Sequence, residues 1–95
     1  MKDRGKLVIW PAYLDKTKSR SKGRIISRRT SVETPTLNEI DMAAKKLGLN
    51  PEVEEDKSYP RSWWEPRGRV LIDDNAPKTH IARRICATIK EMRSA

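Results

Sequence analysis

The sequence predicts an α+β fold: a single β-α-β-β-α domain in which a small three-stranded, mostly antiparallel sheet carries two helices packed on one face. Three short segments are rich in β-branched and aliphatic residues, and two longer segments carry apolar residues at helical spacing. The length of 95 residues is that of one domain, so we expect residues 1–95 to share one small core.

The first half of the chain predicts a strand, a loop and a helix. Residues 6–10 are β-branched and aromatic-rich, and Pro11 ends this strand because proline has no N–H for the ladder. Residues 15–34 hold seven lysines and arginines without a helical or strand period, so they form a long loop, which is usually functional or mobile. A helix is expected over residues 36–48, with Thr36 and Glu39 as a capping box. Its apolar stripe is Leu37, Ile40, Ala44 and Leu47, and Gly48 suits its C-terminal end.

The second half predicts two strands, a loop and a helix. Residues 49–57 alternate in polarity but carry a proline and many acids, which favours an edge strand. A loop with two prolines follows at residues 58–68, and residues 69–73 form the third strand. The second helix is expected over residues 78–93. Its apolar face consists of Ile81, Ile85, Ile89 and Met92.

The charge of the chain is large and segregated by sign. The net charge is +8, and residues 1–36 alone hold 10 basic and 3 acidic side chains. Residues 37–56 hold 2 basic and 6 acidic side chains, and residues 57–69 hold 4 basic and 1 acidic. An excess of this size can serve solubility alone, but two basic segments separated by an acidic one indicate two loops that meet on one side and attract nucleic acid.

The sequence offers little for catalysis, metal binding or a membrane. His80 is the single histidine and Cys86 the single cysteine, so neither has a partner of its own kind at ligand spacing. Asp73 and Asp74 follow a strand and precede Asn75, which is typical of a turn rather than of a metal site. We therefore expect no enzyme activity, cofactor or metal. We also expect no signal peptide or membrane span, and a cytoplasmic, monomeric protein.

The first basic loop has the composition of a phosphate-binding segment. Its cations are interleaved with hydroxyl side chains, which donate hydrogen bonds to phosphate oxygens without adding bulk. A solvated and mobile loop is the alternative. The candidate RNA-binding side chains here are Lys16, Lys18, Arg20, Lys22, Arg24, Arg28 and Arg29.

The aromatic residues lie in or beside the two basic loops, and neither predicted helix carries one. They are Trp10, Tyr13, Tyr59, Trp63 and Trp64. We expect Trp10 in the core, whereas Tyr13, Tyr59 and at least one of the other tryptophans are candidates to stack on bases. Aromatic and arginine stacking is common in the recognition of RNA loops, and neither helix resembles a major-groove reader, so RNA is favoured over DNA.

Several motifs together resemble the family of the 19 kDa protein of the signal recognition particle, in a compact archaeal-like form. They are Trp10-Pro11-Ala12-Tyr13-Leu14-Asp15, Gly23-Arg24-Ile25-Ile26, Pro35, Lys57-Ser58-Tyr59-Pro60-Arg61-Ser62-Trp63 and Gly68-Arg69-Val70. The resemblance covers nearly the whole chain. It implies the fold described above and one partner, the 7S RNA of the particle. It also implies that the protein clamps the tips of two RNA hairpins, helices 6 and 8 of the S domain, so that the signal-sequence-binding GTPase subunit can load.

The resemblance also implies which residues contact the RNA. In the first loop they are Tyr13, Lys16, Lys18, Arg20 and Arg24, and in the second Lys57, Tyr59, Arg61 and Trp63. The stretch Ile26-Ser27-Arg28-Arg29 lacks a proline that the family pattern leads us to expect, which leaves the path of Arg28 and Arg29 open. The lysine-rich tail of longer members has no counterpart here, so we expect no RNA contact from the C-terminus.

Two other functions fit part of the pattern. A basic protein bound to ribosomal RNA would share the same physics and differ only in the RNA. A membrane-surface module would use the helix at 78–93, which has cations off its apolar face, but that face lacks the aromatic residues typical of interfacial helices.

Overall fold

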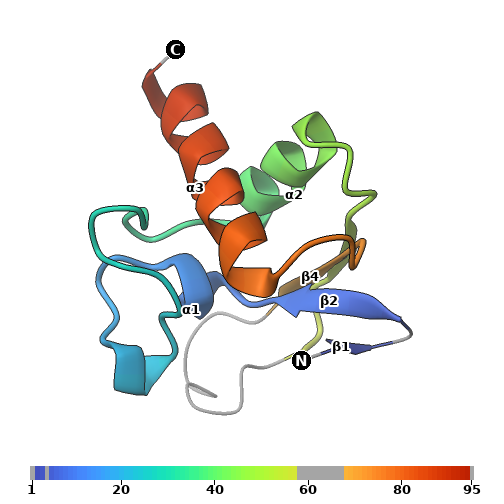
Figure 1. The fold of residues 1–95 in the computed structure, drawn as a ribbon, viewed down its shortest axis with the longest axis horizontal. Coiled ribbons are helices and arrows are strands. Elements are labelled where there is room, and N and C mark those ends of the chain that lie inside the picture. Colours follow the sequence, from blue (N-terminus) through green and yellow to red (C-terminus); the bar gives the residue numbers. More distant parts are fainter. Residues whose placement is uncertain (1, 4, 58–67, 95) are drawn as a thin grey trace.

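The structure is a computed structural model that describes residues 2–3, 5–57 and 68–94. Figure 1 shows a sheet with α2 and α3 on one of its faces, as the sequence predicts. In chain order the elements are β1 (Lys2–Asp3), β2 (Lys6–Ile9), α1 (Pro11–Leu14), the 3₁₀-helix η1 (Arg20–Lys22), α2 (Leu37–Lys46), β3 (Glu52–Glu54), β4 (Arg69–Ile72) and α3 (Lys78–Ser94).

The sheet has the strand order β1-β2-β4-β3, and all of its pairings are antiparallel. The three strands expected from the sequence are confirmed, and the acidic strand β3 lies at an edge, as its composition predicts. The sequence did not predict β1, a strand of two residues that pairs with β2 across a turn at Gly5. So short a strand leaves no polarity pattern to detect.

The predicted capping box of α2 is confirmed. The Glu39 N–H donates to Thr36 Oγ1 at 3.1 Å, and the Thr36 N–H donates to Glu39 Oε1 at 3.0 Å. Gly48 follows the helix with a φ of +71°, the left-handed conformation that its place predicted. Helix α2 is thereby fixed at both ends by residues that the sequence identifies.

Helix α3 packs its apolar stripe into the core between α2 and the sheet. Ile81, Ile85 and Ile89 are at most 2% exposed. Arg93, in the last turn of α3, holds Glu39 of α2 with a two-pronged contact, Nε to Oε2 at 2.7 Å and Nη2 to Oε1 at 2.8 Å. Burial of the isoleucines is the main stabilising contribution, because an ion pair this exposed adds little.

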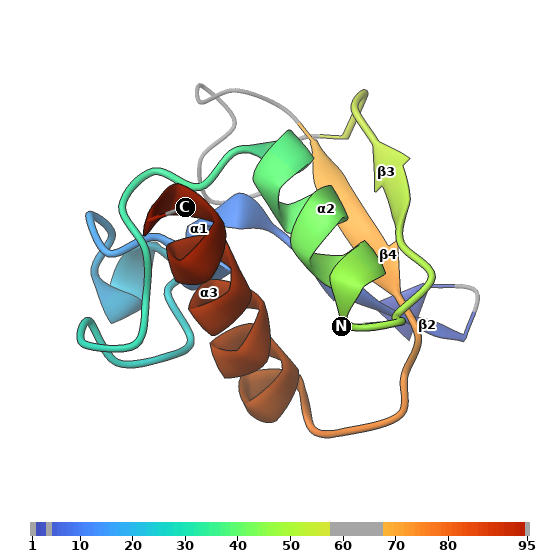
Figure 2. The ribbon, with the colours of Figure 1, turned by 90° about the horizontal axis from the view of Figure 1, so that it is seen from above.

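The chain turns sharply after β2. Pro11 does end the strand, but it also begins the short helix α1, where a proline at the first position loses no hydrogen bond. Helix α1 buries Ala12, Tyr13 and Leu14, and it contacts α3. Figure 2 shows the consequence: the first basic loop leaves on one side of the molecule, and β3 lies on the other.

Candidate nucleic-acid interface

Both basic segments leave the sheet at the same end. Strand β2 runs into α1 and the first loop at the end where Ile9 pairs with Val70, next to the start of β4. The second connection leaves β3 after Glu54, which pairs with Arg69. Because an antiparallel strand ends where its neighbour begins, β2 and β3 both end beside the start of β4, so the first loop and both ends of the second loop lie at one end of the sheet.

The described ends of the second loop are tied together. The Gly68 N–H donates to the carbonyl oxygen of Lys57 at 2.6 Å. Next to this closure, Arg69 binds Glu54 Oε1 at 2.5 Å and lies 5.5 Å from the centre of the Trp10 ring. Lys57, a predicted RNA ligand, is exposed at this edge. The other predicted ligands of this loop, Tyr59, Arg61 and Trp63, lie outside the residues that the structure describes.

Asp15 closes the base of the first loop, residues 15–34. Its Oδ1 accepts hydrogen bonds from the Thr17 N–H at 2.9 Å, the Thr17 hydroxyl at 2.6 Å and the Thr34 N–H at 3.2 Å. The Lys16 N–H adds a bond to the Val32 carbonyl at 2.7 Å. The buried carboxylate therefore joins the two ends of the loop. Its position in the loop was visible in the sequence, but its role was not.

Arg24 stabilises the first loop by binding its backbone from the inside. It is 9% exposed, and its Nε donates to the Ile26 carbonyl at 2.7 Å while its Nη1 donates to the Lys18 carbonyl. Burial, followed by the nearby guanidinium groups of Arg28 and Arg20, lowers the pKa of Arg24. The sequence suggested a surface residue free to meet RNA. The structure instead places Arg24 where it orders the loop backbone, and its RNA contact stays a prediction.

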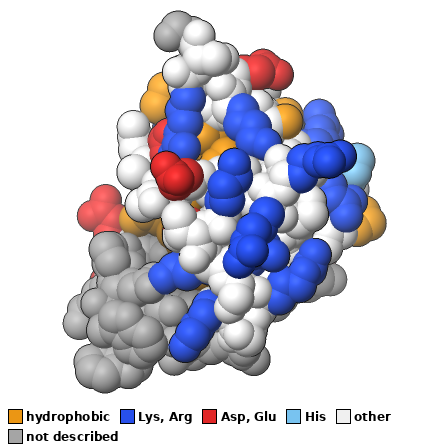
Figure 3. Space-filling view, turned by 90° about the vertical axis from the view of Figure 1, so that its left-hand side faces the viewer, with side chains coloured by type: hydrophobic (Ala, Val, Ile, Leu, Met, Phe, Trp, Pro, Cys, Tyr) orange, Lys and Arg blue, Asp and Glu red, His pale blue; other side chains and the backbone are white. Residues whose placement is uncertain are grey.

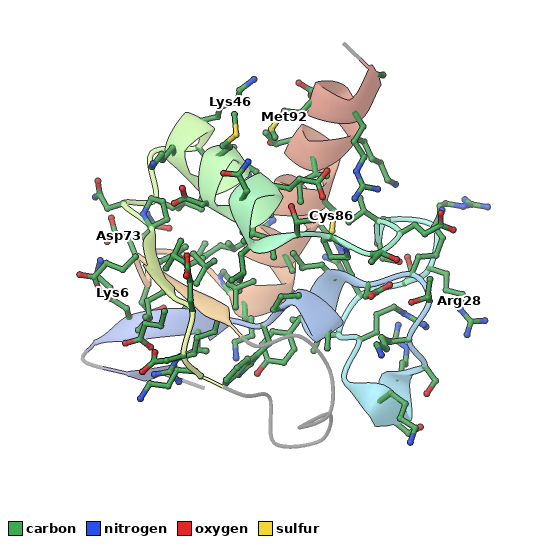
Figure 4. All side chains as sticks on the ribbon, turned by 180° about the vertical axis from the view of Figure 1, so that it is seen from behind. Lys6, Arg28, Lys46, Asp73, Cys86 and Met92 are labelled. Atoms are coloured by element: carbon green, nitrogen blue, oxygen red, sulfur yellow. The ribbon has the colours of Figure 1, made fainter. Side chains whose placement is uncertain are left out.

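The remaining cations of the first loop project outward. The exposed ones are Lys16, Arg20, Lys22, Arg28 and Arg29, and Lys18 is half-buried. Figure 3 shows that lysine and arginine side chains predominate on the side of the molecule that carries this loop. The sequence left the path of Arg28 and Arg29 open. A turn fixes it, with the Thr30 N–H donating to the Ser27 carbonyl at 3.2 Å, and Figure 4 shows Arg28 pointing away from the domain.

The aromatic residues described beside the first loop are buried. Trp10 is 3% exposed, as expected for a core residue. Tyr13 is 8% exposed, and burial raises the pKa of its hydroxyl. Lys78 Nζ lies 4.9 Å from the centre of the Tyr13 ring. Stacking of a base on Tyr13, as the sequence suggested, would require the ring to move. Tyr13 serves the core in this structure, and its RNA contact stays a prediction.

Helix α3 supports the first loop through residues that the sequence did not single out for this role. Lys90 Nζ donates to the Arg29 carbonyl at 2.8 Å, and Arg93 Nη2 reaches the Thr34 carbonyl at 3.5 Å. Both cations lie off the apolar stripe and look like solvated surface in the sequence. Their contacts join residues about 60 positions apart, which no local pattern reveals.

Asp73 follows β4 directly and lies outside the helices and strands. The Asp73 carboxylate accepts a hydrogen bond from Asn50 Nδ2 at 2.7 Å, while Lys6 Nζ donates to the Asn50 carbonyl at 3.1 Å. Figure 4 shows Lys6 and Asp73 close together, far from Arg28. Among the described residues, no three His, Cys, Asp or Glu side chains gather in a way that could hold a metal ion.

None of the helices in the described part of the chain is long and apolar enough to span a bilayer.

Comparison with known proteins gives a consistent family. The family model described as SRP19 protein matches residues 8–92. The signal recognition particle 19 kDa protein of Methanosarcina mazei is 68% identical over 93 residues, which cover 98% of this chain and 92% of that protein.

Solved structures agree in fold. One, described as SRP19 in complex with the S domain of signal recognition particle RNA, has a TM-score of 0.84 and 43% identity, and the match covers 87% of this chain and 95% of that chain. Another, from Pyrococcus furiosus, is described among "the two proteins assembling the ribonucleic core of the Signal Recognition Particle". It has a TM-score of 0.82 and 34% identity, covering 96% of this chain and 100% of that one. The chain therefore belongs to the signal recognition particle 19 kDa protein family.

Proposed function

We propose that this protein binds signal recognition particle RNA and acts as a scaffold rather than as an enzyme. The observation that carries the proposal is the set of outward-facing cations on the first loop, which starts at the same end of the sheet as the segment that contains the exposed Lys57. Cations held on an ordered loop neutralise phosphates without a large ordering cost on binding. A relative of 43% identity is described in complex with the S domain of this RNA.

The finer proposal concerns how the RNA is held. We infer that the first and second loops clamp the tips of two hairpins, helices 6 and 8 of the S domain, side by side. The protein's contribution is charge neutralisation together with a fixed spacing between two sets of contacts. The RNA so arranged would favour loading of the signal-sequence-binding GTPase subunit, in a cytoplasmic particle.

The test is binding of S-domain RNA over a range of salt concentrations. Five exposed cations of the first loop and Lys57 give six candidate phosphate contacts. If all six form, the log–log slope of affinity against salt should be about −4 to −5. A slope near zero would refute electrostatic docking. A ribosomal RNA hairpin of equal length is the competitor, and tighter binding to it would favour the ribosomal alternative.

A test of the clamp requires three RNAs, which carry the first hairpin, the second hairpin or both. A clamp predicts that RNA with both hairpins binds much more tightly than either alone, because the second contact becomes intramolecular. Equal affinities for all three RNAs would leave RNA binding in place and remove the clamp. Binding of the purified GTPase subunit to the same RNAs, with and without this protein, tests the loading step directly.

The membrane-surface alternative loses its main feature in the structure. Its apolar helix face is the stripe Ile81, Ile85 and Ile89, which is buried in the core and cannot enter a lipid headgroup layer without unfolding the domain.

A further inference from the structure

One side of α3 continues the basic surface of the first loop. Arg83 and Lys90 are both exposed, and their separation of seven residues places them on the same side of the helix. Lys90 Nζ donates to the carbonyl of Arg29, so this side of α3 lies against the turn that carries Arg28 and Arg29. We name the surface formed by Arg83, Lys90, Arg28 and Arg29 the α3 flank.

The cations of the α3 flank are not neutralised by the protein. Among the described residues, neither Arg83 nor Lys90 forms an ion pair, whereas Arg93, one turn beyond Lys90, is held by Glu39. Figure 3 shows lysine and arginine side chains spread over this face with few acidic ones among them. A charged surface of one sign that continues a polyanion-binding loop is itself suited to a polyanion.

We propose that the α3 flank is a second RNA-binding surface, which contacts the phosphate backbone of a double-stranded stem below the hairpin tip held by the first loop. This inference rests on the proposed function. Two features favour backbone over bases. Helix α3 carries no phenylalanine, tyrosine or tryptophan on which a base could stack. Arg83 and Lys90 also lie about 10.5 Å apart along the helix axis, too far to share one phosphate but suited to separate phosphates of one strand.

The stem is the part of the RNA that fits this geometry. Phosphates of a duplex stem have a regular spacing, and a straight helix offers cations at a fixed spacing in return. The tips of hairpins are irregular and suit a loop instead. The first loop would thus bind the hairpin tip, and the α3 flank would bind the phosphate backbone of the adjoining stem.

The test compares Arg83→Gln/Lys90→Gln with Lys46→Gln and Arg84→Gln. Lys46 is exposed at the end of α2, and Figure 4 shows it far from Arg28, so Lys46→Gln removes a charge without touching the flank. Arg84 is the same residue type one position on from Arg83, which turns it about 100° around the helix. Both controls should bind S-domain RNA within about twofold of the unmodified protein.

The double variant should bind about fivefold more weakly near 0.15 M salt and lose about 1.5 from the log–log salt slope. Lys90→Gln also removes a bond to the loop, so Arg83→Gln alone is the decisive variant: it should lose about 0.8 in slope with an unchanged melting temperature. An unchanged slope for Arg83→Gln, or an equal loss in Lys46→Gln, overturns the proposal.

RNAs with shortened stems test the assignment to the duplex. On hairpins cut to a few base pairs below the loop, Arg83→Gln and the unmodified protein should bind alike, because the phosphates that Arg83 meets are missing. A deficit of equal size on short and long stems would overturn the stem assignment.

The failure of this inference can be told apart from failure of the proposed function. If the unmodified protein does not bind S-domain RNA, the proposed function fails; if it binds and Arg83→Gln is without effect, only the α3 flank fails. Co-sedimentation with vesicles of phosphatidylserine and phosphatidylcholine serves as the competing arm. Vesicle binding that depends on Arg83, combined with unaltered RNA binding, also overturns the proposal.

Discussion

Replacing Asp15 with alanine should weaken RNA binding, although the change removes a negative charge from beside a polyanion site. Asp15 Oδ1 receives three hydrogen bonds, two from Thr17 and one from Thr34, and so joins the two ends of the first loop. Without this acceptor, the loop loses the closure that presents its cations. Weaker RNA binding by Asp15→Ala would therefore indicate that loop order matters, whereas tighter binding would indicate that only the removed negative charge matters.

The magnitude follows from the lost bonds. A hydrogen bond to a charged acceptor contributes about 1.5–3 kcal/mol, but the two Thr17 donors are not independent, so we expect Asp15→Ala to lower the free energy of unfolding by about 3 kcal/mol. For a domain of this size that corresponds to a fall in melting temperature of about 12 °C. Asp15→Asn keeps an oxygen at the Oδ1 position and should cost only about 1 kcal/mol.

Thermal unfolding and RNA titration on the three proteins provide the assay. We expect the affinity of Asp15→Ala for S-domain RNA to fall by at least about fivefold, because the loop must be ordered again on binding. Asp15→Asn should bind about as well as the unmodified protein. If Asp15→Ala binds as tightly as the unmodified protein or more tightly, or if it melts within about 2 °C of it, the loop-closure argument is wrong.

Four other substitutions, with Gly48→Ala serving as a control, test the remaining structural roles. Arg24→Ala should lower the melting temperature by about 5 °C as well as weaken RNA binding, and a loss of binding with unchanged melting would restore a direct RNA contact. Gly68→Ala should lower the free energy of unfolding, measured in urea, by about 3 kcal/mol, because φ is +123° and the new Cβ would clash with the Leu37 side chain. Gly48→Ala, with open space around it, should lower it by only about 1–2 kcal/mol. Burial raises the pKa of the Cys86 thiol from 9.0 to about 11. Between these pH values the unfolded chain loses the thiol proton while the folded chain keeps it, so the free energy of unfolding falls as pH rises, by about 2 kcal/mol at pH 11. A Cys86→Ala variant should show a correspondingly flatter pH dependence, and identical pH profiles for the two proteins would contradict the shift.

Local signals in the sequence predict the regular elements well. The capping box of Thr36 and Glu39 sets the start of α2, and the isoleucine stripe of α3 sets its buried face. The acids around Val53 predict an edge strand, because a central strand would have to bury them. Each of these signals acts over a few residues, which is why the sequence alone reveals them.

The roles of individual loop residues could not be predicted in the same way. Arg24 and Arg28 look alike in a polar run, yet one is buried against backbone carbonyls and the other is exposed. The difference arises from how residues 15–34 close on themselves, through Asp15 and Thr34, 19 positions apart. Tyr13 is similar: the neighbouring basic loop suggests an RNA-facing ring, but packing of α1 against α3 buries it.

The acidic segment could have disabled the basic surface, and the structure shows why it does not. In the described parts of the chain, its carboxylates pair with Lys45, Arg69 and Arg93, none of which belongs to the exposed cations of the first loop. Figure 2 places β3 on the side of the molecule away from that loop. Exposed charges more than about 8 Å apart are largely screened from each other at physiological salt. The exposed cations of the first loop are therefore left for phosphates rather than paired with the acidic segment.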